Sequence, residues 1–480
     1  MSVFSDLVFE AGLVARSLGD YFAGGAVRLG VTGLSRSGKT VFLTALVSNL
    51  IAGARLPVLA ASAEGRITRA RLEPQPDDAV PRFGYEDHVA SLMGPDRQWP
   101  QSTRRISQLR LTIEFETANR WSGRDASLTL DLVDYPGEWL LDLPLLDKTY
   151  ATWARETLAA SETSARAPLA AGWRAALAGL DVHAEANEDR AREIAEKFTA
   201  YLLKARENVY ALSTLPPGRF LMPGDLEGSP ALTFAPIPLG EGDAIVSGTM
   251  AAMMERRYEA YKTHVVKPFF RDHFARLDRQ IVLVDALTAL NSGPAALSDL
   301  ENALSEVLSA FRAGRASSFA SIFRPRIDRI LFAATKADHL HHTSHDRLEA
   351  ILRLLTARAI ARAEGVGAEI DVIALAAIRA TREAEIRQQG EILKAIIGVP
   401  EKGETIGGDV FDGVAEAAVF PGELPADPAS IFAGDAIALP EADNDWRFVR
   451  FRPPITQRGQ PAPHIRLDRA LQFLIGDRLA

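Results

Sequence analysis

The segment GLSRSGKT, residues 33–40, places two glycines, a lysine and a hydroxyl side chain at a fixed spacing. Gly33 and Gly38 allow a tight turn whose backbone N–H groups point inward, and a following helix adds the positive end of its dipole. Lys39 can then reach the β- and γ-phosphates of a nucleotide, and the Thr40 hydroxyl can coordinate Mg²⁺. We therefore predict a phosphate-binding loop here rather than an ordinary polar turn. The other residues expected to contact the nucleotide in this loop are Ser35, Arg36, Ser37 and Val41.

A second candidate motif, DYPGEW, follows a run of apolar residues typical of a buried strand. A carboxylate at the end of such a strand can hold Mg²⁺ through water, so Asp134 is a predicted metal ligand. Gly137 has no Cβ, and its N–H can therefore approach a γ-phosphate. The alternative is a strand that ends in a Pro-Gly turn. Because this motif follows a predicted phosphate-binding loop in the sequence, a role in nucleotide binding is favoured over the simple turn.

A third motif, TKAD, follows the apolar segment RILFAA. The Asp338 carboxylate can accept two hydrogen bonds from guanine N1–H and N2–H₂, a pair of donors that adenine lacks. The methylene stem of Lys336 can lie over the base, and His339 is expected close to it. Lys-x-Asp is common on protein surfaces, but the position of this motif after the other two indicates guanine recognition.

Two further segments complete the predicted site. In WPQSTRR, Thr103 can join the Mg²⁺ shell when a γ-phosphate is present, Arg104 can neutralise phosphate charge, and Trp99 can stack on the base edge. The alternative is a charged loop that enters a strand. After the apolar segment EIDVIALA, the backbone of Ile378 can lie near guanine O6, and a buried strand end is an equal alternative.

The motifs resemble the phosphate, switch and base motifs of Ras-like GTPases, with two departures that affect the expected chemistry. Thr335 stands where that class usually has asparagine, so guanine selectivity is expected to be looser. Glu138 stands where a water-orienting glutamine is common. A carboxylate can still orient water there but repels the γ-phosphate, so we expect slow intrinsic hydrolysis without a partner. The predicted catalytic residues are Lys39, Gly137, Glu138 and Arg104.

Longer segments are similar to the YcjX family of bacterial P-loop NTPases, and the resemblance covers nearly the whole chain. The segments are GLSRSGKTVFLTALV, WPQSTRRISQLRL, DLVDYPGEWLLDLPLL, ATKADHLHHTSHDRL and PHIRLDRALQFLIGDRL. The resemblance implies a cytoplasmic protein with GTPase-type motifs and a link to the stress response. The family's genes tend to lie beside one for an inner-membrane protein. Such a protein is therefore a candidate effector, and peripheral contact with the inner membrane is a further expectation.

The bulk composition limits the classes of function. The net charge of −8 argues against nonspecific binding to nucleic acid, which needs a basic surface. The chain has no cysteine, which excludes disulfides, thiolate catalysis and cysteine metal sites. No stretch reaches the roughly 18 uncharged apolar residues that span a bilayer. Residues 1–25 combine helical spacing with scattered charges, so they predict a docked helix rather than a secretory signal.

The elements that must position these motifs predict an α/β fold, a P-loop NTPase with a Ras-like GTPase core and a mostly parallel sheet. A large segment after Gly137 is rich in Ala, Leu, Glu, Lys and Arg at helical spacing, which predicts a helical insertion. The expected parts are an N-terminal helix (1–25), a first half of the core (26–140), the insertion (141–278), a second half of the core (279–398) and a C-terminal extension (399–480).

Two features of the second half have less specific readings. WRFVRFRPP predicts an edge strand, on which Arg450 and Arg452 can bind phosphate, although a solvated strand face is favoured. In DHLHHTSH, two histidines at i and i+4 can ligate zinc, but a solvent-facing helix start is the preferred interpretation. The last segment predicts a helix that docks on the core. Its shared face consists of Leu467, Ala470, Leu471 and Leu474.

The predicted function is Mg²⁺-dependent binding and hydrolysis of GTP, with GTP or GDP as the bound nucleotide and a conformational switch as the result. One alternative is an ATPase of the same fold. Asp338 argues against it, because adenine has no matching pair of donors. A second alternative is a catalytically weak nucleotide-binding scaffold, which the large helical insertion would suit.

Overall fold

The computed structural model describes most of the chain from residue 26 to residue 480. The described residues exclude 35, 76, 95, 102–104, 119–123, 164–165, 208–215, 241, 244, 310–326, 366, 389, 407, 433–447 and 458. The helix expected over residues 1–25 lies outside the described part, as do Ser35, Thr103 and Arg104.

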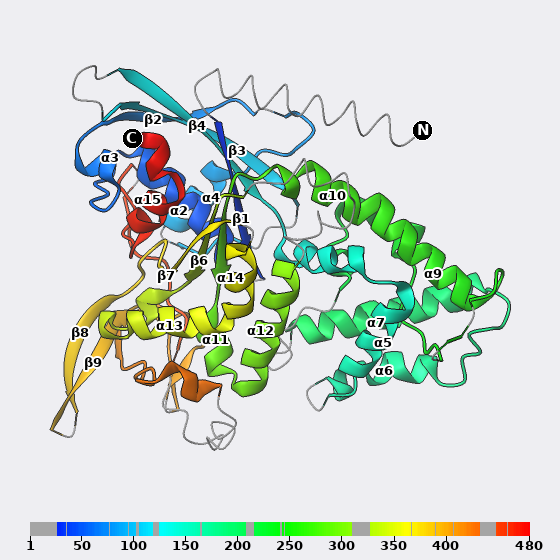
Figure 1. The fold of residues 1–480 in the computed structure, drawn as a ribbon. Helices are drawn as coiled ribbons and strands as arrows, with labels where there is room; N and C mark the ends of the chain where they lie inside the picture. Colours follow the sequence, from blue (N-terminus) through cyan, green and yellow to red (C-terminus); the bar gives the residue numbers. More distant parts are fainter. Residues whose placement is uncertain are drawn as a thin grey trace.

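A seven-stranded sheet forms the centre of the protein (Figure 1), with the strand order β2-β3-β4-β1-β5-β6-β7. The pairs β1–β4, β1–β5, β5–β6 and β6–β7 are parallel, whereas β2–β3 and β3–β4 are antiparallel. This confirms the predicted α/β fold with a mostly parallel sheet. The strands are β1 (Ala26–Gly33), β2 (Ile67–Glu73), β3 (Ser107–Glu116), β4 (Asp125–Asp134), β5 (Arg279–Val284), β6 (Arg329–Ala334) and β7 (Glu369–Ala374).

Helices cover both faces of the sheet, which explains why the central strands are apolar throughout. In β5, Ile281 and Leu283 belong to one apolar core, whereas Val282 and Val284 belong to the core on the opposite face. Successive side chains of a strand point to opposite faces, so both sets are buried. One face carries α2 (Lys39–Ile51) and α15 (Leu467–Ile475), and the other carries α11 (Ala286–Asn291), α12 (Pro294–Ser309), α13 (His345–Leu355) and α14 (Ala357–Glu364).

The terminal helix α15 docks as predicted. All four residues of its expected apolar face are fully buried against the core that α2 shares. Two short helices, α3 (Ala60–Ala63) and α4 (Tyr85–Met93), connect the early strands. Across the described residues, every helix is too short or too polar to span a bilayer.

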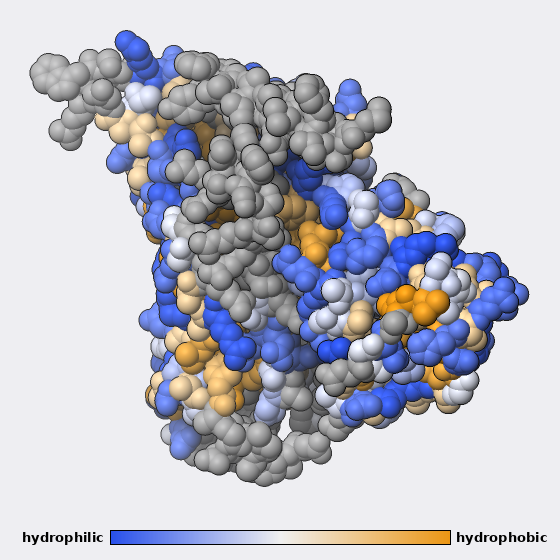
Figure 2. Space-filling model, turned by 45° about the vertical axis from the view of Figure 1, so that its right-hand side comes forward, coloured by the Kyte–Doolittle hydropathy of each residue, from blue (hydrophilic) through white to orange (hydrophobic). Residues whose placement is uncertain are grey.

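The segment after β4 forms a helical lobe beside the sheet (Figures 1 and 2), whose visible surface in Figure 2 is mostly hydrophilic. Its core is aromatic: the Trp153 and Tyr258 rings stack with centroids 5.1 Å apart. The same core includes Val133 and Tyr135 at the end of β4, so the lobe packs directly against the strand that carries the switch motif. The lobe contains a 3₁₀ helix (Gly137–Asp147), α5 (Tyr150–Ala160), α6 (Ala167–Leu177), α7 (Glu188–Glu207), α8 (Gly218–Leu221), α9 (Met250–Tyr261) and α10 (Lys267–Asp272).

A small antiparallel sheet follows the core, with the strand order β12-β9-β8. Its strands are β8 (Arg382–Gln388), β9 (Glu391–Gly398) and β12 (Ala417–Val419), and β10 (Thr405–Ile406) pairs with β11 (Asp409–Val410). The chain thus leaves the central sheet after β7, before residue 399. The edge strand predicted in WRFVRFRPP is wrong within the described residues. Phe451 makes only an isolated bridge with Pro400, and prolines at 400, 453 and 454 cannot donate the hydrogen bonds that would extend it.

Candidate functional site

A cavity of about 360 Å³ lies where the parallel strands of the central sheet end. Segments that are far apart in the sequence meet there, because the carboxyl ends of parallel strands share one edge of the sheet. The predicted site residues that line it are Arg36, Ser37, Gly38, Lys39, Thr40, Val41, Trp99, Glu138, Lys336, Asp338, His339 and Ile378.

The phosphate loop, residues 33–40, turns tightly between β1 and α2. Gly38 has φ 86° and is the N-cap of α2, where it offers no side chain to cap the helix, and the first turn of α2 has no acidic residue. The N–H groups at this helix end are therefore directed at a site suited to an anion. Ser37 Oγ is buried and has no hydrogen-bond partner within the described residues, so it is a further donor at the same place.

Lys39 extends back along the phosphate loop. Its Nζ donates to Gly33 O at 2.7 Å and to Leu34 O at 3.3 Å. Burial lowers the pKa of Lys39, while the carboxylates of Asp134 and Glu138 oppose this shift. The ammonium group thus interacts electrostatically with both the predicted metal ligand and the switch glutamate.

The switch motif packs against the phosphate loop. A Cβ built on Gly137 would lie 1.9 Å from Gly33 O, so only glycine fits at this position. The next residue, Glu138, has a side chain 6% exposed and forms an ion pair with Arg206 of α7, with Oε1 and Nη2 3.0 Å apart. The backbone of Gly137 therefore lies against the phosphate loop, and this contact supports the prediction that its N–H lies near the γ-phosphate.

Asp134 and Thr40 are the described candidates for a magnesium site. Asp134 ends β4 and pairs in register with Val31 of β1, only two residues before the phosphate loop. Both side chains are buried at the head of this loop. A carboxylate and a hydroxyl oxygen belong to the donor types that Mg²⁺ prefers. The residues present therefore fit a magnesium ion.

The base motif also lines the cavity and is held in place by hydrogen bonds. Asp338 is buried, and its Oδ2 accepts a hydrogen bond from Ala380 N at 2.8 Å. Thr335, which replaces the usual asparagine, donates from N and Oγ1 to Val284 O at 2.9 and 3.3 Å. Thr335 thus ties the motif to β5, whereas the asparagine of Ras-like GTPases helps tie it to the phosphate loop.

Lys336 has a partner that sequence reasoning missed. Its backbone is left-handed, with φ 60°, and its Nζ lies 2.5 Å from Asp285 Oδ2. Burial acts to raise the pKa of Asp285, but the Lys336 ammonium and the hydrogen bonds from Thr288 together hold that pKa below its usual value. Asp285 follows directly after β5. Its position at the end of a buried strand, like that of Asp134, could have marked it as a candidate site residue.

The C-terminal extension forms part of the cavity wall, which none of the sequence motifs predicted. Phe451 O accepts a hydrogen bond from Trp99 Nε1 at 2.7 Å, and the Phe451 ring meets the His339 ring edge-on with centroids 5.4 Å apart. Glu401 and Arg450 also line the cavity. The Arg450 side chain is 69% exposed, so the preferred interpretation of a solvated position is confirmed, although the described residues around it form no strand. It also pairs with Glu404 at 2.6 Å.

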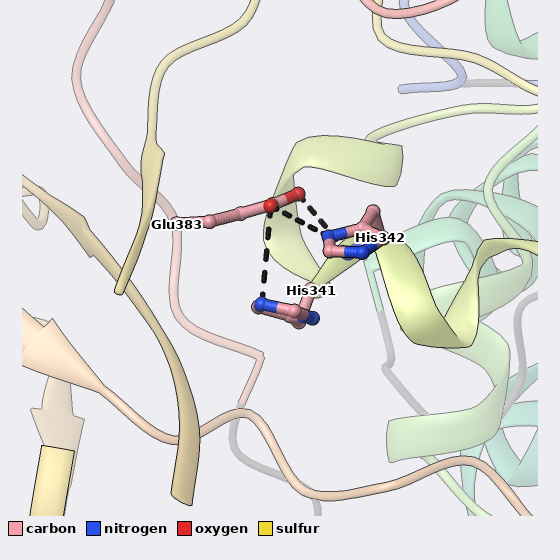
Figure 3. Close-up of side chains that lie close together, drawn as sticks. All are labelled: His341, His342 and Glu383. Atoms are coloured by element: carbon pink, nitrogen blue, oxygen red, sulfur yellow. Dashed lines mark hydrogen bonds and ion pairs between the residues drawn. The ribbon is translucent and has the colours of Figure 1, made fainter. Parts of the chain in front are cut away.

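The histidine cluster after the base motif is mostly buried, so the expected solvent-facing helix start is wrong. His345 Nε2 donates to Ala337 O at 2.9 Å, which separates it from His341. Figure 3 shows that His341 and His342 both point at Glu383 of β8. His342 Nδ1 and Glu383 Oε2 are 2.7 Å apart, and His341 Nε2 is 3.8 Å from the same oxygen. These contacts anchor the base-motif loop to the small sheet.

Comparison with known proteins agrees with this architecture. The model of the YcjX-like family, DUF463, matches residues 27–479. A relative from Escherichia coli (strain K12), named Ras-like GTPase YcjX, is 41% identical over 466 residues, which cover 94% of this chain and 96% of the relative. A relative of the same name from Shewanella oneidensis is 34% identical over 483 residues, 94% of each chain. The chain therefore belongs to the YcjX-like family.

Proposed function

We propose that this protein binds GTP with Mg²⁺ and hydrolyses it to GDP and inorganic phosphate. The observation that carries the proposal is one cavity that is lined by both the phosphate loop and Asp338. The name Ras-like GTPase of two relatives supports it. A magnesium ion held by Thr40 and Asp134 would offset the negative charge of the β- and γ-phosphates.

The protein's own residues would act on the triphosphate through charge and position. Lys39 and the N–H groups at the start of α2 neutralise phosphate oxygens, and Ser37 Oγ donates one more hydrogen bond. Gly137 brings its N–H to the γ-phosphate because its backbone packs against the phosphate loop. Glu138 can orient the attacking water, but its negative charge opposes that of the substrate. Slow hydrolysis follows from this opposition.

The base is selected by Asp338. One carboxylate oxygen is engaged with Ala380 N–H, and the carboxylate still has lone pairs for guanine N1–H and N2–H₂. Trp99 and His339 both line the cavity and offer ring surfaces to the base. Adenine would leave the buried carboxylate without these donors, so an ATPase is disfavoured.

A catalytically weak scaffold is the second candidate function. It is favoured by one observation, the engagement of Glu138 with Arg206, which takes the switch carboxylate away from water. A GTPase that acts as a switch should show nucleotide-dependent movement of the lobe, whereas a static scaffold should not. The cytoplasmic location, contact with an inner-membrane effector and the link to stress stay predictions from the family resemblance.

The test is calorimetric titration with GTP, GDP and ATP in the presence of Mg²⁺, combined with measurement of phosphate release. Lys39→Ala should weaken GTP binding because a charge-assisted contact of about 1.5–3 kcal/mol is lost, which corresponds to roughly 10- to 150-fold in Kd. Lys197→Ala removes an exposed lysine of α7 and is the matched control. Wild-type affinity and turnover in folded Lys39→Ala would refute the proposal.

A further inference from the structure

The switch glutamate is held by the helical lobe and not by the core. The guanidinium of Arg206 comes from the last turn of α7 and lies 3.0 Å from the Glu138 carboxylate. The Glu138 side chain is 6% exposed and that of Arg206 is 26% exposed, so the pair is largely removed from water. Glu138 also lines the cavity. The lobe thus places the Arg206 guanidinium next to Glu138, a residue that lines the candidate nucleotide site.

The positive charge of Arg206 affects the pKa of Lys39 in the phosphate loop. Burial lowers the pKa of Lys39, the carboxylates of Asp134 and Glu138 oppose that shift, and Arg206 adds to it. Two cations, Lys39 and Arg206, and two carboxylates therefore interact electrostatically around the phosphate loop. A γ-phosphate brings further negative charge, which is attracted to the two cations and repelled by Glu138.

The position of Arg206 is set by rigid packing. The residues that precede it on α7, including Phe198, Tyr201 and Leu202, are buried in the lobe core. The Tyr201 ring stacks on Trp173 with centroids 5.5 Å apart. A second lobe segment also touches the switch, because a Cβ built on Gly218 would lie 1.8 Å from Glu138 O. The helix therefore presents the guanidinium to the switch from a fixed base, and side-chain rotation alone would move it.

We propose that Arg206 is a catalytic residue that the helical lobe supplies in cis, an inference that rests on the proposed GTPase function. The γ-phosphate displaces Glu138 from Arg206, and the guanidinium then donates to γ-phosphate oxygens. A planar guanidinium with several N–H donors suits the oxygens of a phosphoryl group. It stabilises the charge on the group being transferred, which is the largest requirement of this reaction.

The step balances without a further reactant. Water forms a bond to the γ-phosphorus, and the bond from that phosphorus to the bridging oxygen breaks with its electron pair left on GDP. The protons of the water go to inorganic phosphate and solvent. Glu138, released from Arg206, is then available to orient the water. The same exchange of partners transmits the presence of the γ-phosphate to α7 and the lobe.

The experiment is single-turnover hydrolysis of bound GTP by wild type, Arg206→Ala and Arg206→Lys. Arg206→Ala should lower the rate on the order of 10²-fold or more, as expected when an arginine is removed from a phosphoryl-transfer site. Its affinity for GDP should change by less than about threefold, which corresponds to roughly 0.6 kcal/mol. The reason is that GDP has no γ-phosphate for Arg206 to contact. Arg192→Ala, at an exposed site on the same helix, should match wild type.

Two further measurements separate catalysis from support of the fold. Wild type should bind GDP with aluminium fluoride, a mimic of the transferred phosphoryl group, more tightly than GDP alone, and Arg206→Ala should lose this gain. Glu138→Gln should hydrolyse GTP faster than wild type, because its neutral side chain releases Arg206 and does not repel the γ-phosphate. Adding Arg206→Ala to that variant should abolish the benefit.

The outcomes distinguish the two proposals. A wild-type protein that does not bind or hydrolyse GTP refutes the proposed function and this inference together. Hydrolysis by wild type at the same rate as by folded Arg206→Ala overturns only the role of Arg206. An equal loss of GDP and GTP affinity in Arg206→Ala, with normal response to aluminium fluoride, assigns the ion pair to structure and also overturns it.

Discussion

Asp338 holds the wall of the cavity in place, and we propose that it also recognises the base. Its Oδ2 accepts from Ala380 N, and its own backbone carbonyl accepts from the Thr381 hydroxyl, so it holds the loop after β7 in place. The same loop carries Ile378 into the cavity. In the proposed function, recognition of guanine and the shape of the base pocket therefore depend on one residue.

Asp338→Asn should weaken GTP binding and narrow the preference for GTP over ATP. An amide cannot accept from Ala380 N–H and also present two acceptors to guanine. Loss of two charge-assisted hydrogen bonds of roughly 1.5–3 kcal/mol each corresponds to roughly 10²- to 10⁴-fold in discrimination. The measurement is calorimetric titration with both nucleotides, with the exposed Asp346→Asn as the control. An unchanged GTP:ATP ratio would show that the base is read elsewhere.

At the scale of elements, the phosphate loop after β1 and the switch segment after β4 form one tightly packed unit. The two strands are parallel neighbours, so their ends lie side by side, and Gly137 comes within contact distance of Gly33. This contact needs the absence of a side chain, because the nearest atom belongs to a backbone carbonyl and cannot rotate away.

Gly137→Ala should disrupt this unit. The added methyl overlaps Gly33 O, and relief of the overlap requires a backbone shift that costs about 1–3 kcal/mol. We expect a lower free energy of unfolding, measured by urea denaturation, together with weaker GTP binding. Gly172→Ala in α6 is the control. A Cβ there meets nothing within 4 Å, and alanine should stabilise the helix slightly. Equal stability of the two variants would contradict the steric argument.

The 3₁₀ helix that joins the switch to the lobe contains a buried acid. Asp142 accepts from Gly218 N at 2.6 Å and from the Tyr261 hydroxyl at 2.6 Å. Burial raises its pKa to about 6, although these hydrogen bonds and Arg219 act in the opposite direction. The folded protein therefore binds this proton more readily than the unfolded chain does.

The expected result is a pH-dependent stability that Asp142→Asn removes. The contribution is fully present below pH 3.8, the ordinary value, and is lost as the pH rises through about 6. The full difference corresponds to about 3 kcal/mol. Urea denaturation from pH 4 to pH 7.5 should therefore show wild type losing stability relative to Asp142→Asn. Exposed Asp147→Asn is the control. Parallel profiles for wild type and Asp142→Asn would disprove the shift.

On the scale of the whole molecule, the lobe and the core share one continuous apolar region. Val133 and Tyr135 of the core belong to the same cluster as the lobe aromatics, and Tyr135 meets Phe269 edge-on with centroids 5.6 Å apart. The switch segment runs directly into this region. A change in its position should therefore move packed helices together instead of a single loop.

The corresponding prediction concerns nucleotide-dependent protection. With a slowly hydrolysed GTP analogue, residues 97–106 and 135–150 should exchange amide hydrogens more slowly than with GDP, because the γ-phosphate adds contacts to both segments. Helix α15, which packs on the central sheet and not in the lobe core, serves as the internal control. Hydrogen-exchange mass spectrometry provides the measurement. Equal protection in both states would exclude the switch and favour the static scaffold.

Local sequence determined the motifs and their place on the fold. The phosphate loop needs a left-handed turn and a helix start, and Gly38 followed by an apolar helical run specifies both within a few residues. The apolar runs before Asp134 and Thr335 likewise predicted β4 and β6, and the order of parallel strands then brings their ends together. The terminal helix α15 followed from its own periodicity.

Only the tertiary structure decided which residues outside the motifs complete the site. Phe451 reaches Trp99 across 352 positions, and Lys336 finds Asp285 across 51. Arg206 meets Glu138 because α7 packs against the switch segment, and nothing in its neighbouring sequence marks that contact. The burial of His341 and His345 likewise depends on elements distant in sequence. Periodicity and spacing reflect the local conformation of a segment, so the sequence predicts that conformation. Contacts between distant segments depend on how the whole chain packs, so only the tertiary structure shows them.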